Sequence, residues 1–409
     1  MDLFIKVPED VQFIIDTLTE DGYEAYIVGG CVRDSILKRN INDWDMTTSA
    51  KPEEVVRLFD KVILTGIEHG TVTIVLNDNQ YEVTTFRNDG EYDDNRHPVK
   101  VEFVNDLKED LARRDFTINA MAYNRFSGLQ DYFNGMNDLK NRTIKTVGNA
   151  KMRFNEDALR MMRAVRFSAQ LDFDIDTDTL KAINEVSLNI ESISKERIRD
   201  EFNKILLSNP EKIGILKDYG LLNYIIPELI DMKYNNILTS KEVKDVLHLR
   251  LAAILMDLGE STSLNILKRL KYDNDTVKKV ISLITYQHTD LNDTITIKKL
   301  MNNIGIDLTY DLIELKRGKA ICNKIENKNR FDEYNEILSK INNIIKNKEC
   351  YSLKQLNING NDLINLGFNR GKDIGSVLKC LLDIVIEDPK SNDKDKLLEI
   401  VYRIKNDKI

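Results

Sequence analysis

Long hydrophobic runs are missing from this chain of 409 residues. No apolar stretch reaches the roughly 18 residues that a helix needs to cross a bilayer, so we expect no membrane partner. The N-terminal segment MDLFIKVPED also lacks the basic-then-apolar order of a secretory signal. With 42% hydrophobic and 31% charged residues, the composition predicts a soluble globular protein, and the length is enough for two or three domains.

Cysteine is scarce and scattered. The four cysteines, Cys31, Cys322, Cys350 and Cys380, form no CxxC pair. This spacing suggests neither a disulfide framework nor a zinc site. A reducing, cytoplasmic location is the simplest expectation.

Positive charge is in the minority, with a net charge of −8, which at first argues against nucleic acid as a partner. The charge is uneven, however. Residues 261–409 hold 26 Lys and Arg against 21 Asp and Glu, whereas residues 1–260 hold 33 against 46. From charge alone, solvated helix faces are the better interpretation of the basic part. It is still compatible with binding RNA phosphates.

The sequence pattern changes once along the chain, from mixed strand and helix signals to helix signals. Up to about Val147, short β-branched and aromatic runs such as EAYIVGG, GTVTIVL, YEVTTFR and KVEFV alternate with helical segments. From about Asn155 the apolar spacing becomes helical and strand signals fade. The sequence predicts an α+β fold, with an α/β head followed by an all-helical remainder.

A pair of carboxylates stands out in NINDWDMTTSA. If this stretch is a strand, Asp43 and Asp45 project from the same side and Trp44 faces the other way, into the head. Two such charges repel each other unless a cation lies between them, and an oxygen-only ligand set favours Mg²⁺. A bare DxD is more often a solvated turn, so the surrounding residues have to decide.

The preceding segment YIVGGCVRDSIL predicts a strand, a glycine turn at Gly29 and Gly30, and a helix from Cys31 or Val32. Glycines allow the backbone to approach a ligand closely, and a helix N-terminus offers N–H groups to an anion. Arg33 can add a phosphate contact. A third acid, Glu82 in QYEVTTFR, lies in another expected strand, although it could equally be an exposed residue on an edge strand. Three carboxylates around two metal ions suit phosphoryl or nucleotidyl transfer.

Several separated motifs resemble those of one enzyme family. The blocks YIVGGCVRD, NDWDMTTSA, EVTTFRNDGEYDDNRHP, DLARRDFTINAMAYN, NEDALRMMRAVRF and SKERIRDEFNKIL occur in the order typical of class II CCA-adding enzymes, the tRNA nucleotidyltransferases. These enzymes share motifs with bacterial poly(A) polymerases. The resemblance covers roughly residues 22–210 and is looser beyond Pro210, where NGNDLINLGFNRGKDIGSVL resembles the family's tail.

The resemblance implies an architecture and a reaction. The fold would be a nucleotidyltransferase head (1–147) followed by a helical neck (148–210), body (211–330) and tail (331–409), with tRNA bound by the tail. The enzyme would add C, C and A to the tRNA 3′ end from CTP and ATP and release pyrophosphate. No protein partner is implied. An A-adding enzyme, a poly(A) polymerase and an inactive RNA-binding protein remain as alternatives.

The resemblance also implies roles for individual residues. Asp43 and Asp45 would hold two Mg²⁺ ions, and Glu82 would help to activate the attacking hydroxyl. The implied nucleotide-binding residues are Gly29, Gly30, Arg33, Arg114, Asp157, Arg160, Arg163 and Arg166. The last four are three residues apart and would form a stripe along one helical face.

Within that stripe, Asp157 and Arg160 suit the selection of cytosine and adenine. Both bases offer an amino donor beside a ring-nitrogen acceptor, so a carboxylate and a guanidinium can pair with either. Guanine and uracil present the opposite order, which would leave buried polar groups unpaired at a cost of about 1–3 kcal/mol each.

Two features of the sequence indicate which kind of family member this chain resembles. Some members carry a metal-binding His-Asp module after the neck, but here the matching stretch reads Met256-Asp257. The chain has only four histidines, so we expect His248 and His288 to be ordinary helix residues. The polar segment 87–98 corresponds to a flexible loop that CCA-adding and A-adding members share, and it argues against a purely CC-adding enzyme.

Overall fold

The structure is a computed structural model that describes residues 4–90, 101–231, 234–323, 328–369 and 371–406. The chain divides into two compact units, Met1–Asp231 and Met232–Ile409. The division into head, neck, body and tail stays a prediction. Among the residues described, none of the helices combines the length and the apolarity that a membrane crossing needs.

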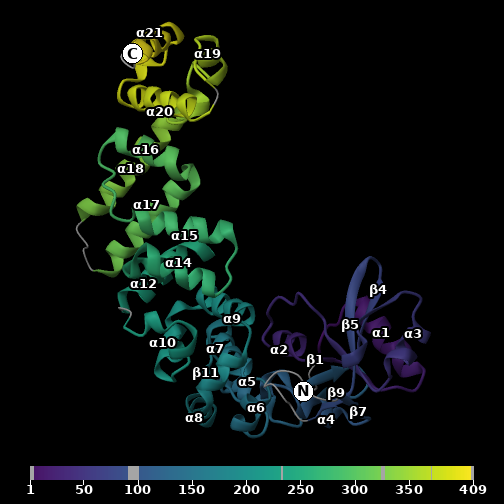
Figure 1. Ribbon diagram of the computed structural model, residues 1–409. Coiled ribbons are helices and arrows are strands. Elements are labelled where there is room, and N and C mark those ends of the chain that lie inside the picture. Colours follow the sequence, from purple (N-terminus) through teal and green to yellow (C-terminus); the bar gives the residue numbers. More distant parts are fainter. Residues whose placement is uncertain (1–3, 91–100, 232–233, 324–327, 370, 407–409) are drawn as a thin grey trace. The chain divides into compact units, whose positions relative to one another are not determined.

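A seven-stranded mixed sheet forms the centre of the N-terminal part (Figure 1). Its spatial order is β3-β4-β5-β2-β1-β8-β9. Neighbouring strands are antiparallel except for the parallel pair of β2 and β5. The strands are β1 (Ala25–Val28), β2 (Met46–Thr48), β3 (Val62–Gly66), β4 (Thr71–Leu76), β5 (Asn79–Thr85), β8 (Ala122–Asn124) and β9 (Gly128–Gln130). The expected small mixed sheet is confirmed.

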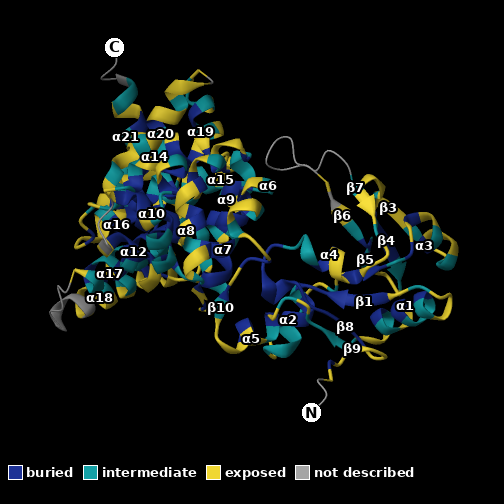
Figure 2. Ribbon diagram, turned by 90° about the horizontal axis from the view of Figure 1, so that it is seen from below, coloured by how far each residue is buried: buried dark blue, intermediate teal, exposed yellow. Residues whose placement is uncertain are grey.

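Helices cover this sheet and bury the middle strands. All four residues of β1 are buried, and the strand is dark blue in Figure 2. Tyr26 and Val28 share a core with Leu107 and Leu111 of α4 (Leu107–Ala112). Helix α1 (Glu9–Glu20), which contacts β1, buries apolar residues at a helical spacing, namely Val11, Ile14, Ile15 and Leu18. Helix α2 (Gly30–Ile36) also contacts β1, and α3 (Pro52–Leu58) contacts β4 and α1.

Two short strand pairs lie outside the main sheet and correct the sequence-based expectations. Strand β6 (Arg87–Asp89) pairs with β7 (Val101–Phe103), so the first residues of the predicted 87–98 loop are a strand. Residues 91–100 of that loop lie outside the described residues. Strand β10 (Thr143–Ile144) pairs in parallel with β11 (Asp174–Ile175), which places a strand in the region expected to be all-helical.

Helices make up most of the remaining chain. In the N-terminal unit they are α5 (Gly135–Lys140), α6 (Ala150–Glu156), α7 (Leu159–Leu171), α8 (Thr177–Val186), α9 (Lys195–Ser208), α10 (Ile213–Asp218) and α11 (Leu222–Ile225). In the C-terminal unit they are α12 (Tyr234–Glu242), α13 (Leu247–Leu255), α14 (Gly259–Arg269), α15 (Asn274–Tyr286), α16 (Thr294–Ile304), α17 (Ile306–Cys322), α18 (Lys328–Lys346), α19 (Gly360–Asn365), α20 (Lys372–Glu387) and α21 (Lys394–Asn406). Short 3-10 turns occur along the whole chain, at Ile67–His69, Thr117–Asn119, Ser187–Ser192, Pro210–Lys212, Pro227–Leu229, Met256–Leu258, Leu353–Gln355 and Pro389–Ser391.

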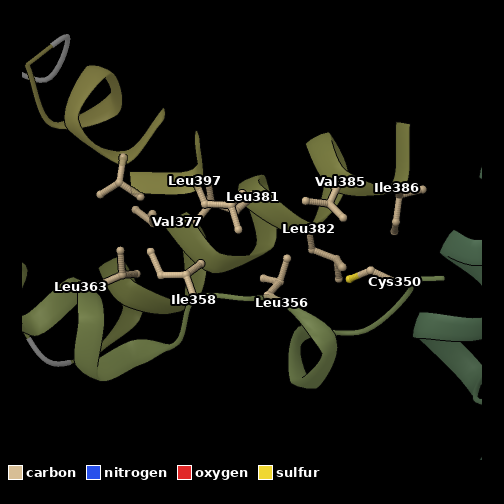
Figure 3. Packing of buried hydrophobic residues seen from close by; sticks show 11 residues of the cluster. Cys350, Leu356, Ile358, Leu363, Val377, Leu381, Leu382, Val385, Ile386 and Leu397 are labelled. Carbon is tan, nitrogen blue, oxygen red and sulfur yellow. The ribbon is translucent and has the colours of Figure 1, made fainter. Parts of the chain in front are cut away.

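The last helices have a hydrophobic core of their own (Figure 3). Helix α20 supplies Val377, Leu381 and Val385 at four-residue spacing, and Leu363 of α19 and Leu397 of α21 join the same cluster. The preceding segment contributes Cys350, Leu356 and Ile358. A thiol in this position acts as a small apolar group.

An ion pair between a buried lysine and a half-buried glutamate connects α16 to the start of this cluster. Lys298 is 2% exposed, and its Nζ lies 2.7 Å from Oε2 of Glu349, the residue before Cys350. The hydrogen bond from Lys298 lowers the pKa of Glu349. The carboxylate of Glu349 compensates the buried positive charge of Lys298, which would be strongly unfavourable without a partner.

Replacing Glu349 with alanine is therefore expected to destabilise the C-terminal unit by about 3 kcal/mol, because the buried ammonium of Lys298 loses its partner. Urea unfolding measures the change. The double variant Lys298→Met with Glu349→Ala, which removes both charges, should regain most of the loss. Equal stabilities for the single and double variants would contradict this interpretation.

Candidate active site

The two aspartates of the DxD motif lie just before β2, not within it. Strand β2 begins at Met46, one residue after Asp45. The backbone nevertheless continues the pairing with β1, because the N–H of Val28 donates to the carbonyl oxygen of Asp45 (3.0 Å). Asp45 is therefore held beside the residue that precedes the Gly29–Gly30 turn.

A solvent-open hollow of about 710 Å³ brings the three expected carboxylates together. Asp43, Asp45 and Glu82 line it, and so does Trp44. The expectation that Trp44 faces away into the head is wrong: its side chain is half-buried and lines the same hollow. Because the strand starts only at Met46, the alternation of side chains that would have turned Trp44 inward does not apply to residues 43–45.

Strand register explains why Glu82 reaches this place. Strand β5 lies between β4 and β2, so Glu82 is not on an edge strand. In the parallel β2–β5 pair, Met46 is opposite Val83. Asp45 and Glu82 each precede one of these partners and so lie at the same level of the sheet.

The electrostatics of the hollow favour a bound cation. Burial of the carboxyl group raises the pKa of Asp45; the nearby Arg114 opposes this, and the like charge of Asp43 adds to it. A positive ion between two neighbouring carboxylates relieves the repulsion between their charges.

The side chains of the hollow supply only some of the ligands that a divalent metal ion needs, and a bound substrate would supply others. Among the described residues, no group of three or more His, Cys, Asp or Glu side chains is arranged to hold a metal ion by itself. Two or three carboxylates facing one hollow match the way Mg²⁺ is held, with substrate phosphates and water completing its octahedron. The residues present therefore fit a metal that arrives with a nucleotide.

The glycine turn after β1 lacks side chains, so other groups can come close to its backbone. Gly29 has φ of 79°, a left-handed conformation that favours glycine, and a Cβ there would lie 3.2 Å from Nη1 of Arg114. Helix α2 begins at Gly30, one residue earlier than expected. A side chain at position 29 would displace the arginine that stands over the turn.

Two arginines expected to contact nucleotide are held close to this turn. Arg33 is buried and donates to Oδ1 of Asn119 (2.6 Å) and to both carboxylate oxygens of Asp34. Arg114 donates to Oδ2 of Asp110 (3.3 Å), and its buried Nε has no hydrogen-bond partner in the described part of the chain. A buried guanidinium with a spare donor is suited to an incoming anion.

The expected stripe of Asp157, Arg160, Arg163 and Arg166 is interrupted. Helix α6 ends at Glu156 and α7 begins at Leu159, so Asp157 lies in the break between them and not on the helix. Its Oδ1 accepts from the N–H of Leu159 (3.0 Å), and its Oδ2 accepts from Nη2 of Arg197 (3.1 Å). Asp is a favourable residue at a helix start, and this local hydrogen bond explains the break.

The three arginines of α7 each have an acidic partner. Nη1 of Arg160 donates to Oε2 of Glu156 (2.5 Å), and its Nη2 donates to the carbonyl oxygen of Arg113 (3.0 Å). Arg163 donates to Oδ2 of Asp115 (2.5 and 2.8 Å), and Arg166 to Oε2 of Glu201 (2.5 Å). Arg160 and Arg163 thus connect α7 to the 113–115 segment beside the glycine turn.

Asp115 is the most strongly perturbed of these acids. Burial by itself would raise its pKa, but the charge of Arg163 and hydrogen bonds from Asn119 and Arg163 overcome this and bring the pKa to about 2. The carboxylate therefore stays ionised in the fold well below the pH at which an unfolded aspartate is protonated.

This shift predicts a pH-dependent contribution to stability. The unfolded pKa is about 3.9, so the ion pair contributes on the order of 2 kcal/mol above about pH 4, and this contribution is lost as the pH falls toward 2. Asp115→Asn should destabilise the N-terminal unit at pH 7, and the gap to wild type should narrow below pH 4. Urea unfolding followed by fluorescence of Trp44, the only tryptophan, measures this. The exposed Asp174→Asn is the control; a gap that stays constant with pH would contradict the ion-pair assignment.

His248 and His288 were both expected to be ordinary helix residues. His248 on α13 contacts Asp311 on α17 (Nε2 to Oδ2, 2.7 Å). His288 lies in a turn after α15, so the expectation of a helix position is wrong for it. The Gln287–His288 turn follows the end of α15 at Tyr286.

Sequence reasoning missed the acids that hold the arginines in place. Asp110, Asp115 and Glu201 were not singled out, nor was Arg197. One signal was available: Asp110 precedes Arg113 and Arg114 by three and four residues, the spacing of ion pairs on a helix. The other three pairs join segments 35 to 48 residues apart, which the sequence alone does not bring together.

Family models match most of the chain. Residues 25–145 match the "Poly A polymerase head domain", residues 172–233 the "Probable RNA and SrmB- binding site of polymerase A", and residues 248–401 a model of tRNA nucleotidyltransferase domain 2. The first match contains the carboxylates, the glycine turn and Arg114.

Curated relatives match over nearly the whole length. The CCA-adding enzyme of Ligilactobacillus salivarius is 37% identical over 97% of this chain and 96% of its own. The CCA-adding enzyme of Staphylococcus epidermidis is 35% identical over 97% of this chain and 98% of its own.

Solved structures share the fold. The crystal structure of the Bacillus stearothermophilus CCA-adding enzyme in complex with CTP matches with a TM-score of 0.82 and 30% identity, covering 98% of this chain and 100% of that one. The Thermotoga maritima CCA-adding enzyme complexed with tRNA matches in fold with a TM-score of 0.66 at 22% identity, covering 97% and 96%. Nucleotidyltransferases of this kind are generally metal-dependent. The chain belongs to the family of CCA-adding enzymes, which are nucleotidyltransferases.

Proposed function

We propose that this protein adds C, C and A to the 3′ end of tRNA in the cytoplasm, using CTP and ATP and one active site in its N-terminal unit. The observation that carries this proposal is the gathering of Asp43, Asp45 and Glu82 in one hollow, beside the Gly29–Gly30 turn. Relatives of this chain are named for the same reaction, and a related structure contains CTP.

Asp43 and Asp45 would hold two Mg²⁺ ions together with the nucleotide. When bound, these ions neutralise the phosphates and polarise the α-phosphorus for in-line displacement. The two aspartates are suited to this because they face the same hollow.

The chain's own groups bind and orient the reactants. The tRNA 3′-hydroxyl oxygen bonds to the α-phosphorus of the nucleotide, the bond to the bridging oxygen breaks, and pyrophosphate leaves. Glu82, which lies at the level of Asp45 in the sheet, would take up the hydroxyl proton. The backbone at Gly29 and Gly30, together with Arg33 and Arg114, would bind the triphosphate.

Base selection would fall to Asp157 and Arg160, with Arg163 and Arg166 supporting α7. Asp157 lies in the break before α7, where its carboxylate accepts from the N–H of Leu159 and from Arg197. A carboxylate has further lone pairs, and these would accept from an amino group of cytosine or adenine. Arg160 carries several N–H donors, and a base can take one now used by Glu156 or the Arg113 carbonyl. In this arrangement Arg166 has a positioning task, because Glu201 engages it away from the break.

The C-terminal unit would bind the tRNA. Its basic excess supplies charge for the phosphates, and the tail core gives a stable platform for that contact. The division into head, neck, body and tail belongs to this proposal. Truncation after Lys348 should weaken tRNA binding more than CTP binding.

One experiment separates the proposed function from its alternatives. The purified protein receives tRNA lacking CCA, lacking CA or lacking A, each with CTP, ATP or both, and the products are sequenced. The proposal predicts that every acceptor is completed to CCA and that extension then stops. Addition of A alone would indicate an A-adding enzyme, and long A tails a poly(A) polymerase. No product would indicate an RNA-binding protein without activity.

A further inference from the structure

Asp110 on α4 occupies an unusual position for an acidic side chain. It is 0% exposed, and its two carboxylate oxygens have different sets of donors. Oδ1 accepts from Nε and Nη2 of Arg113 (2.9 and 2.8 Å) and lies 3.4 Å from the N–H of Arg87. Oδ2 accepts from the hydroxyl of Thr47 (3.2 Å) and from Nη2 of Arg114 (3.3 Å). A buried charge of this kind persists only because its donors surround it.

The Oδ2 side of this carboxylate joins two parts of the candidate site. Thr47 lies on β2, two residues after Asp45, so it moves with the strand that follows the metal-binding pair. Arg114 stands over the glycine turn, with its Nη1 3.2 Å from the position of a Cβ on Gly29. Through one oxygen, Asp110 therefore sets the place of Arg114 relative to Asp45.

The guanidinium of Arg114 lies close to the Gly29 turn. Its buried Nε has no hydrogen-bond partner in the described part of the chain. The ion pair with Asp110 thus leaves Arg114 with a donor to spare beside the Gly29 turn.

We propose that Asp110 is a positioning residue for catalysis, which holds the Arg114 guanidinium between the glycine turn and Asp45 so that it meets the triphosphate of either nucleotide. This inference rests on the proposed function and adds to it a residue outside the hollow. Asp110 does not touch the nucleotide and acts through Arg114.

Charges on Arg113 and Arg114 overcome the effect of burial and lower the pKa of Asp110, so the carboxylate is ionised at neutral pH. Replacing it with asparagine removes the charge and retains the shape. Arg114 then loses its ion pair with Asp110. Displacement of a group that binds the phosphates is expected to lower the rate about 10- to 100-fold.

The test is a double-mutant cycle between Asp110→Asn and Arg114→Met, measured by single-turnover addition of C and of A. Asp110→Asn should raise the KM for CTP and ATP alike and lower kcat/KM about 10- to 100-fold. Affinity for tRNA and the preference for C and A should not change. In the Arg114→Met background, Asp110→Asn should cost little more, because its effect passes through Arg114.

Arg113→Met is the matched control, since it removes the arginine on the other oxygen and should affect KM much less. Asp110→Glu is the second variant if Asp110→Asn does not fold, because it keeps the charge and shifts the carboxylate by one methylene group. It should also raise the KM for both nucleotides and show the same non-additivity with Arg114→Met.

Independent, additive losses from the Asp110 and Arg114 changes would overturn the inference, and so would an equal loss in Arg113→Met. Failure of the proposed function is recognised separately, because it requires that the wild-type protein itself fails to complete tRNA to CCA.

Discussion

Changing Asp43 or Asp45 to alanine is expected to lower the rate of nucleotide addition by roughly 1,000-fold or more. The two carboxylates face one hollow, and each would hold a metal ion that is worth several kcal/mol to the transition state. Addition of C and of A should fall together, because both would use the same clamp.

The measurement is single-turnover extension of a tRNA ending before C and of one ending before A, at saturating tRNA. Affinity for tRNA should stay close to that of wild type, because the C-terminal unit would carry most of the contact. Glu53→Ala on α3 is a suitable control, since it removes one exposed negative charge from the same unit. Near-normal rates for either aspartate variant with Mg²⁺ would show that the metal assignment is wrong.

The second large effect concerns base choice. In Asp157→Ala the amino group of C or A loses its acceptor, while the carbonyl oxygen of U or G no longer faces a carboxylate. Discrimination against UTP and GTP should relax by about 5- to 150-fold, the equivalent of 1–3 kcal/mol for an unpaired buried group. Arg160→Ala should act in the same direction. It should also cost some rate, because Arg160 connects α7 to the Arg113 carbonyl.

Single-turnover addition of all four nucleotides to both tRNA ends measures this. Residual use of CTP should remain above that of Asp43→Ala, because the metal clamp is intact. Lys151→Ala, which breaks an exposed pair with Glu185 on neighbouring helices, is the control. A uniform loss for all four nucleotides with unchanged preference would falsify the base-reading role and leave Asp157 as a helix cap.

The sequence predicted those parts of the site that depend on local pattern. The glycine turn between β1 and α2 followed from Gly29 and Gly30, and five of the strands followed from β-branched runs. Glu82 was placed in a strand by the same pattern. That it lies beside Asp45 depends on the parallel pairing of β2 with β5, a contact between segments 37 residues apart that no local pattern specifies.

Two errors at the site have local physical causes. The start of β2 was placed too early, and with it Trp44 was turned inward; element boundaries are the least certain part of any such reading. Asp157 was placed on a helix because the resemblance put it in one stripe with three arginines at three-residue spacing. Its carboxylate instead accepts from the N–H of Leu159, the first residue of α7, in the break between the two helices. Capping by Asp competes with helix continuation, and the sequence spacing does not reveal which prevails.

The network of arginines and acids was the least predictable part. Basic residues along α7 suggested a solvated or ligand-facing stripe, whereas Arg163 and Arg166 are occupied by Asp115 and Glu201. These pairs depend on the packing of α7 against the 113–115 segment and α9. Of these acids, only Asp110 could have been paired from the sequence, because it precedes Arg113 and Arg114 by three and four residues.

One metal site beside Asp43 and Asp45 would perform both C and A addition. This is tested directly with CTP and ATP in which one non-bridging α-phosphate oxygen is replaced by sulfur, as separate diastereomers. We expect one diastereomer to react slowly with Mg²⁺, and a metal ion with more affinity for sulfur, such as Mn²⁺ or Cd²⁺, to restore its rate. The same diastereomer should behave in this way for C and for A. Absence of any metal-dependent rescue, or rescue of opposite diastereomers for the two nucleotides, would contradict it.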